Sequence, residues 1–219
     1  MAKRRQIVVV GLGRFGTAVA ETLVAVGHEV LALDISARRV QEVGDHVTHA
    51  AQADGTDPET LRELGVADFD VGVVGVSSQL ERSILITLQL KRLGVPYVVA
   101  KAQTELHGEV LEKVGADRVV YPEREMGDRL AHSITVPNVL DYLPIGDDYG
   151  ISKLKPPSSF VGRTVRDLAL PDRHGITLLL IERPSQVVIN PGPEERIRAQ
   201  DLLVLAGPDD AMEQLSAES

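Results

Sequence analysis

The chain has 219 residues, a formal net charge of −9 and 43% hydrophobic residues, few of them aromatic. A sequence this acidic lacks the basic face that nucleic acid requires, which excludes DNA and RNA as partners, and the absence of cysteine excludes disulfides, cysteine-ligated zinc and thiol chemistry. No apolar run approaches the roughly 20 residues that span a bilayer, so the sequence predicts a soluble, cytoplasmic protein.

The first predicted element is a strand over Ile7–Val10 that runs directly into the glycine pattern Gly11-x-Gly13-x-x-Gly16. Gly11 permits a tight turn, Gly13 lets the backbone approach a phosphate, and Gly16 lets the next helix pack against the sheet. The helix predicted over Gly13–Val26 presents its free N–H groups and positive dipole end at the same place, which favours an anion. The pattern therefore predicts a nucleotide site.

A second predicted strand, Glu29–Leu33, ends at Asp34, about 20 residues beyond the glycine pattern. A carboxylate here accepts hydrogen bonds from both ribose hydroxyls and repels a 2′-phosphate, which disfavours NADP. The alternative is that Asp34 caps the next predicted helix, Ala37–Val43, but Ser36 is better placed for that role. We therefore expect Asp34 to bind a ribose.

Short apolar runs alternate with amphipathic stretches up to about residue 121. Six strands separated by five helices predict an α/β fold with a Rossmann-like, doubly wound parallel sheet. The predicted strands are Ile7–Val10, Glu29–Leu33, Val47–Ala51, Val71–Val76, Tyr97–Lys101 and Arg118–Tyr121. The predicted helices are Gly13–Val26, Ala37–Val43, Asp57–Leu64, Gln79–Leu93 and Glu105–Val114. Four glycines are expected as left-handed helix ends: Gly27, Gly65, Gly94 and Gly115.

Further polar residues follow the third and fourth predicted strands, at the edge of the sheet where a nucleotide lies. Asp54 and Gly55 are placed for an adenine, with a plain turn as the alternative. Ser77 and Ser78 are placed to cap the next helix and also to line the pocket. Arg14, inside the glycine pattern, is expected to reach toward phosphates, with a solvated arginine at the start of a helix as the alternative.

The pattern changes after Pro122. A helical stretch over Arg124–Ser133 is followed by Pro137 and Pro144, which mark an exit from the first domain. We predict a nucleotide-binding domain over residues 1–137 and a linker with a small α+β domain over residues 138–219. This second domain is expected to have one short helix near residues 164–168 and to lean on a partner copy, since so few residues bury little surface alone. Its predicted strands are Gly150–Leu154, Ile176–Glu182, Val187–Ile189 and Leu202–Gly207.

No catalytic constellation is visible in the sequence. The six histidines are scattered without helical spacing, which does not indicate a histidine-ligated metal. Nothing resembles a nucleophile elbow or an evident proton donor for hydride chemistry, and the second domain is too small for a catalytic domain. A regulatory nucleotide sensor fits these observations better than an enzyme.

Two stretches, VVVGLGRFGTAVAETLVAVGHEVLALD and KAQTELHGEVLEKVGADRVVYPEREMG, together with the late QDLLVLAG, resemble the RCK (regulator of potassium conductance) proteins, the cytosolic subunits of Ktr- and Trk-type potassium uptake systems. The likeness extends over residues 6–207, and the size matches the single-RCK Ktr gating subunit. It implies an RCK N-lobe and C-lobe, and binding of ATP or ADP, or NAD(H) in some members, without turnover. It also implies dimers in an octameric ring beneath an integral membrane, potassium-translocating subunit, which places the protein at the inner face of the plasma membrane.

The resemblance also assigns site residues by position. A cation, Mg²⁺ or Ca²⁺, is implied between Glu123 and the terminal phosphate, because a triphosphate beside a carboxylate needs one. The alternative for Glu123 is an acid favoured by the dipole in the first turn of a helix. The implied nucleotide-binding residues are Gly11, Gly13, Arg14, Phe15, Gly16, Asp34, Ile35, Ser36, Asp54, Gly55, Val76, Ser77, Ser78, Lys101, Ala102, Gln103, His107 and Glu123.

Some relatives bind cyclic di-AMP at the C-lobe through an aliphatic pair followed by Asp-x-Arg-x-Asn. Here Arg166 falls in the aliphatic pair, Asp167 is kept, and the later Arg and Asn are missing, which weighs against this ligand. The leading hypothesis is a non-catalytic ATP/ADP-sensing gate of a potassium transporter. The alternatives are an NAD-dependent oxidoreductase, for which the glycine pattern and Asp34 suffice, and a nucleotide-binding scaffold for another partner.

Overall fold

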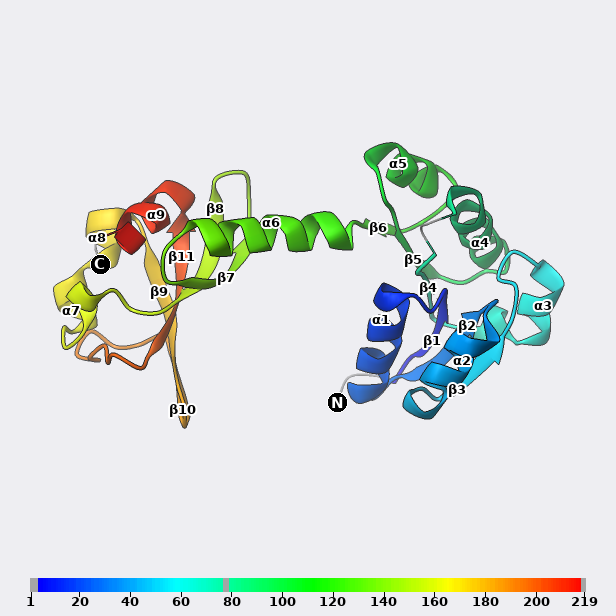
Figure 1. Ribbon diagram of the computed structural model, residues 1–219, viewed down its shortest axis with the longest axis horizontal. Coiled ribbons are helices and arrows are strands. Elements are labelled where there is room, and N and C mark those ends of the chain that lie inside the picture. The colour runs from blue at the N-terminus through cyan, green and yellow to red at the C-terminus, as the bar shows by residue number, and fades with distance from the viewer. Residues whose placement is uncertain (1–3, 77–78, 218–219) are drawn as a thin grey trace. The chain divides into compact units, whose positions relative to one another are not determined.

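The computed structural model describes residues 4–76 and 79–217, so the predictions for Ser77 and Ser78 lie outside the described residues. The chain forms two compact units that divide between Glu123 and Arg124 (Figure 1). The predicted domain boundary lies after residue 137, whereas most of helix α6 (Pro122–Thr135) belongs to the second unit. The reason is visible at Arg129, whose guanidinium binds the carboxylate of Asp141 and the carbonyl oxygen of Tyr142 in the second unit.

The first unit is built on a parallel sheet with the strand order β3-β2-β1-β4-β5-β6, which confirms the doubly wound prediction. Its strands are β1 (Gln6–Val10), β2 (Glu29–Asp34), β3 (His49–Gln52), β4 (Val71–Val74), β5 (Tyr97–Lys101) and β6 (Arg118–Val120). Its helices are α1 (Arg14–Ala25), α2 (Ala37–Val43), α3 (Pro58–Glu63), α4 (Leu80–Arg92) and α5 (Glu105–Lys113). The four expected left-handed glycines all have positive φ: Gly27, Gly65, Gly94 and Gly115.

The third strand begins later than predicted, at His49 rather than Val47. Thr48 explains the difference, because its side-chain oxygen, and not its backbone, accepts the hydrogen bond from the backbone N–H of Val30 at 3.0 Å. Val47 ends the short 3-10 helix that precedes the strand.

Both faces of the sheet are covered, as the apolar strands require. On β1, Ile7 and Val9 pack into one cluster with residues of α1 and α2. Val8 and Val10 point to the opposite face and pack with residues of α3, α4 and α5. The period of two in a strand produces this division. Because the strands are parallel, the loops that lead into α1, α2 and α4 all lie at the carboxyl edge of the sheet, after β1, β2 and β4.

The second unit contains a five-stranded antiparallel sheet with the order β10-β9-β11-β8-β7. Its strands are β7 (Val139–Pro144), β8 (Tyr149–Leu154), β9 (Thr177–Arg183), β10 (Gln186–Ile189) and β11 (Leu202–Pro208). The predicted strands do not include β7, whose residues fall in the expected linker. Pro137 and Pro144 suggested an exit, but Pro144 ends the strand at the sheet edge, where a missing N–H is tolerated.

Three helices complete the second unit: α7 (Val165–Leu168), α8 (Leu170–His174) and α9 (Asp209–Ala217). Only the first was predicted. Leu168, Leu170 and Leu215 from these helices pack with the inward residues of the sheet. A buried ion pair lies beside this core, where Arg183 donates to both carboxylate oxygens of Asp201 at 2.9 and 3.2 Å.

Candidate nucleotide-binding site

The glycine loop between β1 and α1 has the geometry that its sequence predicts. Gly11 has a φ of +97°, and its N–H donates to the carbonyl oxygen of Leu33 at 2.7 Å. A Cβ added to Gly11 would lie 2.5 Å from Cγ2 of Val76, and a Cβ added to Gly16 would lie 1.9 Å from the carbonyl oxygen of Gly11. Both distances are too short for any other residue type. Gly13, at the N-cap of α1, faces open space. The loop therefore needs glycine at two positions for packing and leaves the third open to a ligand.

Asp34 at the end of β2 ties this loop to the next turn. Its side chain is buried and accepts hydrogen bonds from the backbone N–H of Leu12 at 2.7 Å and of Ser36 at 2.8 Å. Arg39 of α2 approaches the same carboxylate at 3.4 Å. Ser36 occupies the N-cap position of α2 without a side-chain capping bond. Asp34 thus fixes the backbone at the cavity edge and still presents its carboxylate there.

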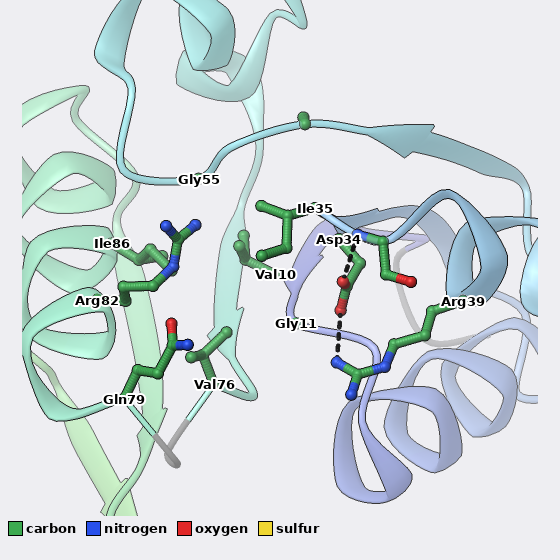
Figure 2. A pocket seen from close by; sticks show the side chains of 12 residues that line it. Val10, Gly11, Asp34, Ile35, Arg39, Gly55, Val76, Gln79, Arg82 and Ile86 are labelled. Atoms are coloured by element: carbon green, nitrogen blue, oxygen red, sulfur yellow. Dashed lines mark hydrogen bonds and ion pairs between the residues drawn. The ribbon is translucent and has the colours of Figure 1, made fainter.

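A cavity of ≈ 290 Å³ opens at the carboxyl ends of the central strands (Figure 2). Six of the sequence-assigned residues line it: Gly11, Asp34, Ile35, Ser36, Gly55 and Val76. Six further residues, outside the nucleotide-binding set that the resemblance implied, also line it: Val10, Arg39, Ala53, Gln79, Arg82 and Ile86. Ala53 and Gln79 adjoin the polar residues expected after the third and fourth strands. Arg82 had one available signal, its place in the first turn of the helix after β4. The cavity combines an apolar floor with a few polar groups, as small-molecule sites do.

A second, more open hollow of ≈ 640 Å³ lies around the first turn of α1. Gly13 and Arg14 line it, and Arg39 lines both this hollow and the cavity. Free N–H groups at the start of α1 and two guanidinium groups make this hollow suitable for phosphate.

Asp54 is turned to a neighbouring side chain and is absent from the described lining of the cavity. Its carboxylate accepts hydrogen bonds from the backbone N–H and hydroxyl of Thr56, and from Arg82 at 2.7 and 3.3 Å. Burial opposes its ionisation, but the bonds from Thr56 and Arg82 outweigh burial and lower the pKa of Asp54.

Lys101, Phe15 and Glu123 form a second group at the end of β5. The Lys101 ammonium is buried, lies 5.7 Å from the centroid of the Phe15 ring, and pairs with the exposed carboxylate of Glu123. The hydrogen bond from Lys101 is the main cause that lowers the pKa of Glu123, and the charge of Arg14 adds to it. Glu123 is therefore ionised and close to the positive charges of the glycine loop.

The remaining assigned residues, Ala102, Gln103 and His107, hold the turn from β5 to α5. Ala102 is buried and donates its N–H to the carbonyl oxygen of Val120. His107 is buried, with Nδ1 accepting from the Gln103 N–H at 3.3 Å and Nε2 lying 2.8 Å from the hydroxyl oxygen of Ser83. Burial lowers the pKa of His107, so the ring is neutral.

Within residues 4–76 and 79–217, no group of three or more histidine, aspartate or glutamate residues is arranged to hold a metal ion. Glu123, the metal ligand that the resemblance implied, therefore belongs to no such group among these residues. Over the same residues, no helix combines the length and apolar character needed to cross a membrane.

A glycine turn between β1 and α1, an acid at the end of β2 and a cavity at the carboxyl edge of the parallel sheet define a Rossmann-type nucleotide-binding protein. The model of the TrkA-N domain matches residues 7–122 and that of the TrkA-C domain matches residues 151–218. The chain therefore belongs to the family of TrkA-N and TrkA-C domain proteins, as the RCK resemblance implied.

Relatives and solved structures agree with this assignment. The chain is 38% identical to the Ktr system potassium uptake protein A of Bacillus subtilis (strain 168), over 94% of this chain and 92% of that protein. Its fold is similar to the crystal structure of the GsuK RCK domain, with a TM-score of 0.68, 19% identity, and coverage of 100% of this chain and 49% of that one. The GsuK channel bound to NAD gives a TM-score of 0.66 at 19% identity over 98% and 39% of the two chains.

Proposed function

We propose that this protein is a nucleotide-sensing regulatory subunit of a membrane potassium transporter. The observation that carries the proposal is its similarity over 94% of its length to a potassium uptake protein. The lining supports adenine nucleotides as the ligands, because Asp34 lines the cavity with a carboxylate suited to a ribose, and Arg14 lines the neighbouring hollow with a cation suited to phosphates. In this proposal the protein works at the inner face of the plasma membrane through its transporter partner.

The function that we propose is non-catalytic. Among the described lining residues of the cavity, Asp34 is the single acid, and three donors already hold it. The charged side chains beside it are guanidinium groups, which do not act as bases. Such a cavity favours binding without turnover. An NAD-dependent oxidoreductase is the competing function, because Asp34 suits any ribose and the GsuK channel, which shares the fold, is described with NAD.

Discrimination between ATP and ADP requires a group that reads the terminal phosphate, since a ligand bound equally by two states shifts neither. Glu123 is our candidate, acting through Mg²⁺ or Ca²⁺. Its carboxylate is one ligand of the cation, and the phosphates, water or a second copy of the chain supply the other ligands. The hydrogen bond from Lys101 lowers the pKa of Glu123, which suits this role because it favours the ionised carboxylate near the glycine loop.

A second copy of the chain is part of the proposal. Helix α6 exposes an apolar stripe at helical spacing, Met126, Leu130 and Ile134, with exposed fractions of 58%, 56% and 74%. Apolar surface of this kind favours self-association. We propose a dimer through α6 that assembles into an octameric ring beneath the membrane subunit. Cyclic di-AMP is not part of the proposal, because the retained Asp167 is engaged in the capping box of α7.

Calorimetric titration of the purified full chain with ATP, ADP and NADH, with and without Mg²⁺ or Ca²⁺, tests the ligand. We expect ATP to bind more tightly with the cation present, and Glu123→Gln to abolish this enhancement while leaving ADP affinity nearly unchanged. Glu109→Gln, at an exposed acid of α5, is the matched control. NADH binding as tight as ATP binding, with no effect of cations, would contradict the proposal. An equal loss of ATP and ADP in Glu123→Gln would remove Glu123 as the sensor.

A further inference from the structure

Arg82 lines the cavity although no sequence pattern assigned it a role. It lies in the first turn of α4, and its side chain is about three-quarters buried. Figure 2 shows the side chain extending from α4 along the cavity, with Ile35 entering the same space from the turn after β2. A long cationic side chain held in a partly apolar cavity requires an explanation.

Asp54 balances the charge of Arg82 and holds its guanidinium, but this pairing does not explain why the side chain lines the cavity. Both terminal nitrogens of the guanidinium donate to Asp54, at 2.7 and 3.3 Å. Asp54 is itself fixed by two hydrogen bonds from Thr56, so the guanidinium is held from the loop after β3. Two N–H groups at the end of the guanidinium are thereby engaged, and its charge is matched. Its planar face takes no part in these bonds and is available to a ligand.

A planar face of this kind suits an aromatic ring better than a phosphate. Arginine stacks on rings through its delocalised plane as well as through charge. Three other lining residues agree, because Val10, Val76 and Ile86 are apolar and offer no hydrogen bonds from their side chains. Gln79 adds one polar amide to this part of the cavity. The phosphate-binding features lie at Gly13 and Arg14, in the other hollow.

We propose that Arg82 is a base-recognition residue, whose guanidinium is held by Asp54 and stacks on the purine of the nucleotide. Ile35, in the turn after β2, is the apolar residue that lines the same space. The proposal deepens the function proposed above and rests on it for the presence of an adenine ligand. It does not depend on which adenine nucleotide is bound, because ATP, ADP and NADH share the base.

Titration of the full chain with ATP, ADP, NADH and inorganic tripolyphosphate tests this inference. We expect Arg82→Ala to weaken ATP, ADP and any bound NADH by the same factor, about 3- to 30-fold, the range of a partly desolvated cation–π contact. Tripolyphosphate, which has no base, keeps its affinity. Arg82→Lys retains a cation for Asp54 but loses the planar face, so it weakens the same nucleotides with little change in melting temperature. Arg92→Ala, at an exposed residue of the same helix, is the matched control.

The outcomes separate the two proposals. Unchanged nucleotide affinity in both Arg82 variants overturns the inference and reduces Arg82 to a brace for Asp54. An equal loss of tripolyphosphate and ATP also overturns it, since Arg82 then acts on phosphates or on the fold. Wild-type protein that binds NADH alone, weakened by Arg82→Lys, supports the inference while contradicting the ATP/ADP proposal. Wild-type protein that binds no adenine nucleotide overturns both.

Discussion

Asp34 carries two tasks that the sequence presents as alternatives. One oxygen holds the N–H of Leu12 in the glycine loop, and the other holds the N–H of Ser36 at the start of the next helix. A buried carboxylate held by several donors is fixed in position, which pre-organises it for a ligand. The capping alternative is therefore too narrow, since the two N–H groups belong to two different turns.

Replacement of Asp34 tests its ribose role. We expect Asp34→Ala to weaken ATP and ADP by about 1–3 kcal/mol each, the value of a charge-assisted hydrogen bond lost in a buried site. The loss is the same for both nucleotides because both contain the ribose. Calorimetric titration measures it, and Asp45→Ala, at an exposed acid near the end of α2, is the control. Full affinity in Asp34→Ala would show that the carboxylate serves the loop alone.

His107 makes the stability of the first unit depend on pH. Burial lowers the pKa of His107 in the folded protein, so the unfolded chain binds the proton more tightly. The stabilisation that depends on the neutral ring is complete above the unfolded pKa of about 6.5 and is lost as pH falls toward the lower folded value. We expect wild-type protein to lose more stability between pH 7.5 and pH 5.5 than His107→Gln does, measured by urea unfolding. A His46→Gln control, at an exposed histidine, keeps the wild-type dependence; identical pH profiles for all three proteins would refute the assignment.

At the scale of elements, helix α6 has an apolar face that no other part of the chain covers among the residues described. Arg129 fixes it to β7, yet three apolar side chains on another face have large exposed fractions. An amphipathic helix with an uncovered apolar stripe favours a partner helix of the same kind.

Charge placed on that stripe tests the dimer. We expect Leu130→Asp and Ile134→Asp to shift the protein toward monomer, because a carboxylate buried against apolar side chains without a partner is strongly disfavoured. Sedimentation velocity at several concentrations measures the change. Asp128→Asn, on the opposite side of α6 by helical spacing, leaves the association state unaltered. A dimer of undiminished strength in both aspartate variants would place the interface elsewhere.

At the scale of the whole molecule, each unit has its own apolar core, and every described lining residue of the cavity belongs to the first unit. Stability of the second unit and nucleotide affinity of the first are therefore separable quantities. The buried pair of Arg183 and Asp201 offers a way to change one without the other.

Asp201→Ala leaves a buried guanidinium with one carboxylate partner fewer, and we expect it to destabilise the second unit by about 3–5 kcal/mol. Nucleotide affinity measured below the unfolding transition is unchanged. The control, Arg166→Ala, breaks the exposed pair with Glu194, which is worth about 0–1 kcal/mol. Chemical denaturation, monitored by hydrogen exchange in each unit, measures both changes in stability. Nucleotide affinity that falls together with stability would show that the two units are coupled.

Sequence reasoning predicted most of the first unit because its signals are local. The short apolar runs, the glycine turn and the acid after β2 can each be recognised within a few residues. The observed strand order agrees with the doubly wound sheet that they predict. The second unit was predicted less well. β7 was missed because Pro137 and Pro144 suggest a break, although the strand with which it pairs, β8, follows it directly in the chain.

By itself, the sequence determined the doubly wound fold, the place of the glycine loop and the carboxylate at the end of β2. Only the tertiary structure decided which side chains meet. Asp54 turns to Arg82, twenty-eight positions away, and His107 lies against Ser83 on another helix. The physical reason is that backbone conformation follows from local residue types, whereas the partner of a polar side chain depends on which loops the parallel strands bring to the same edge of the sheet.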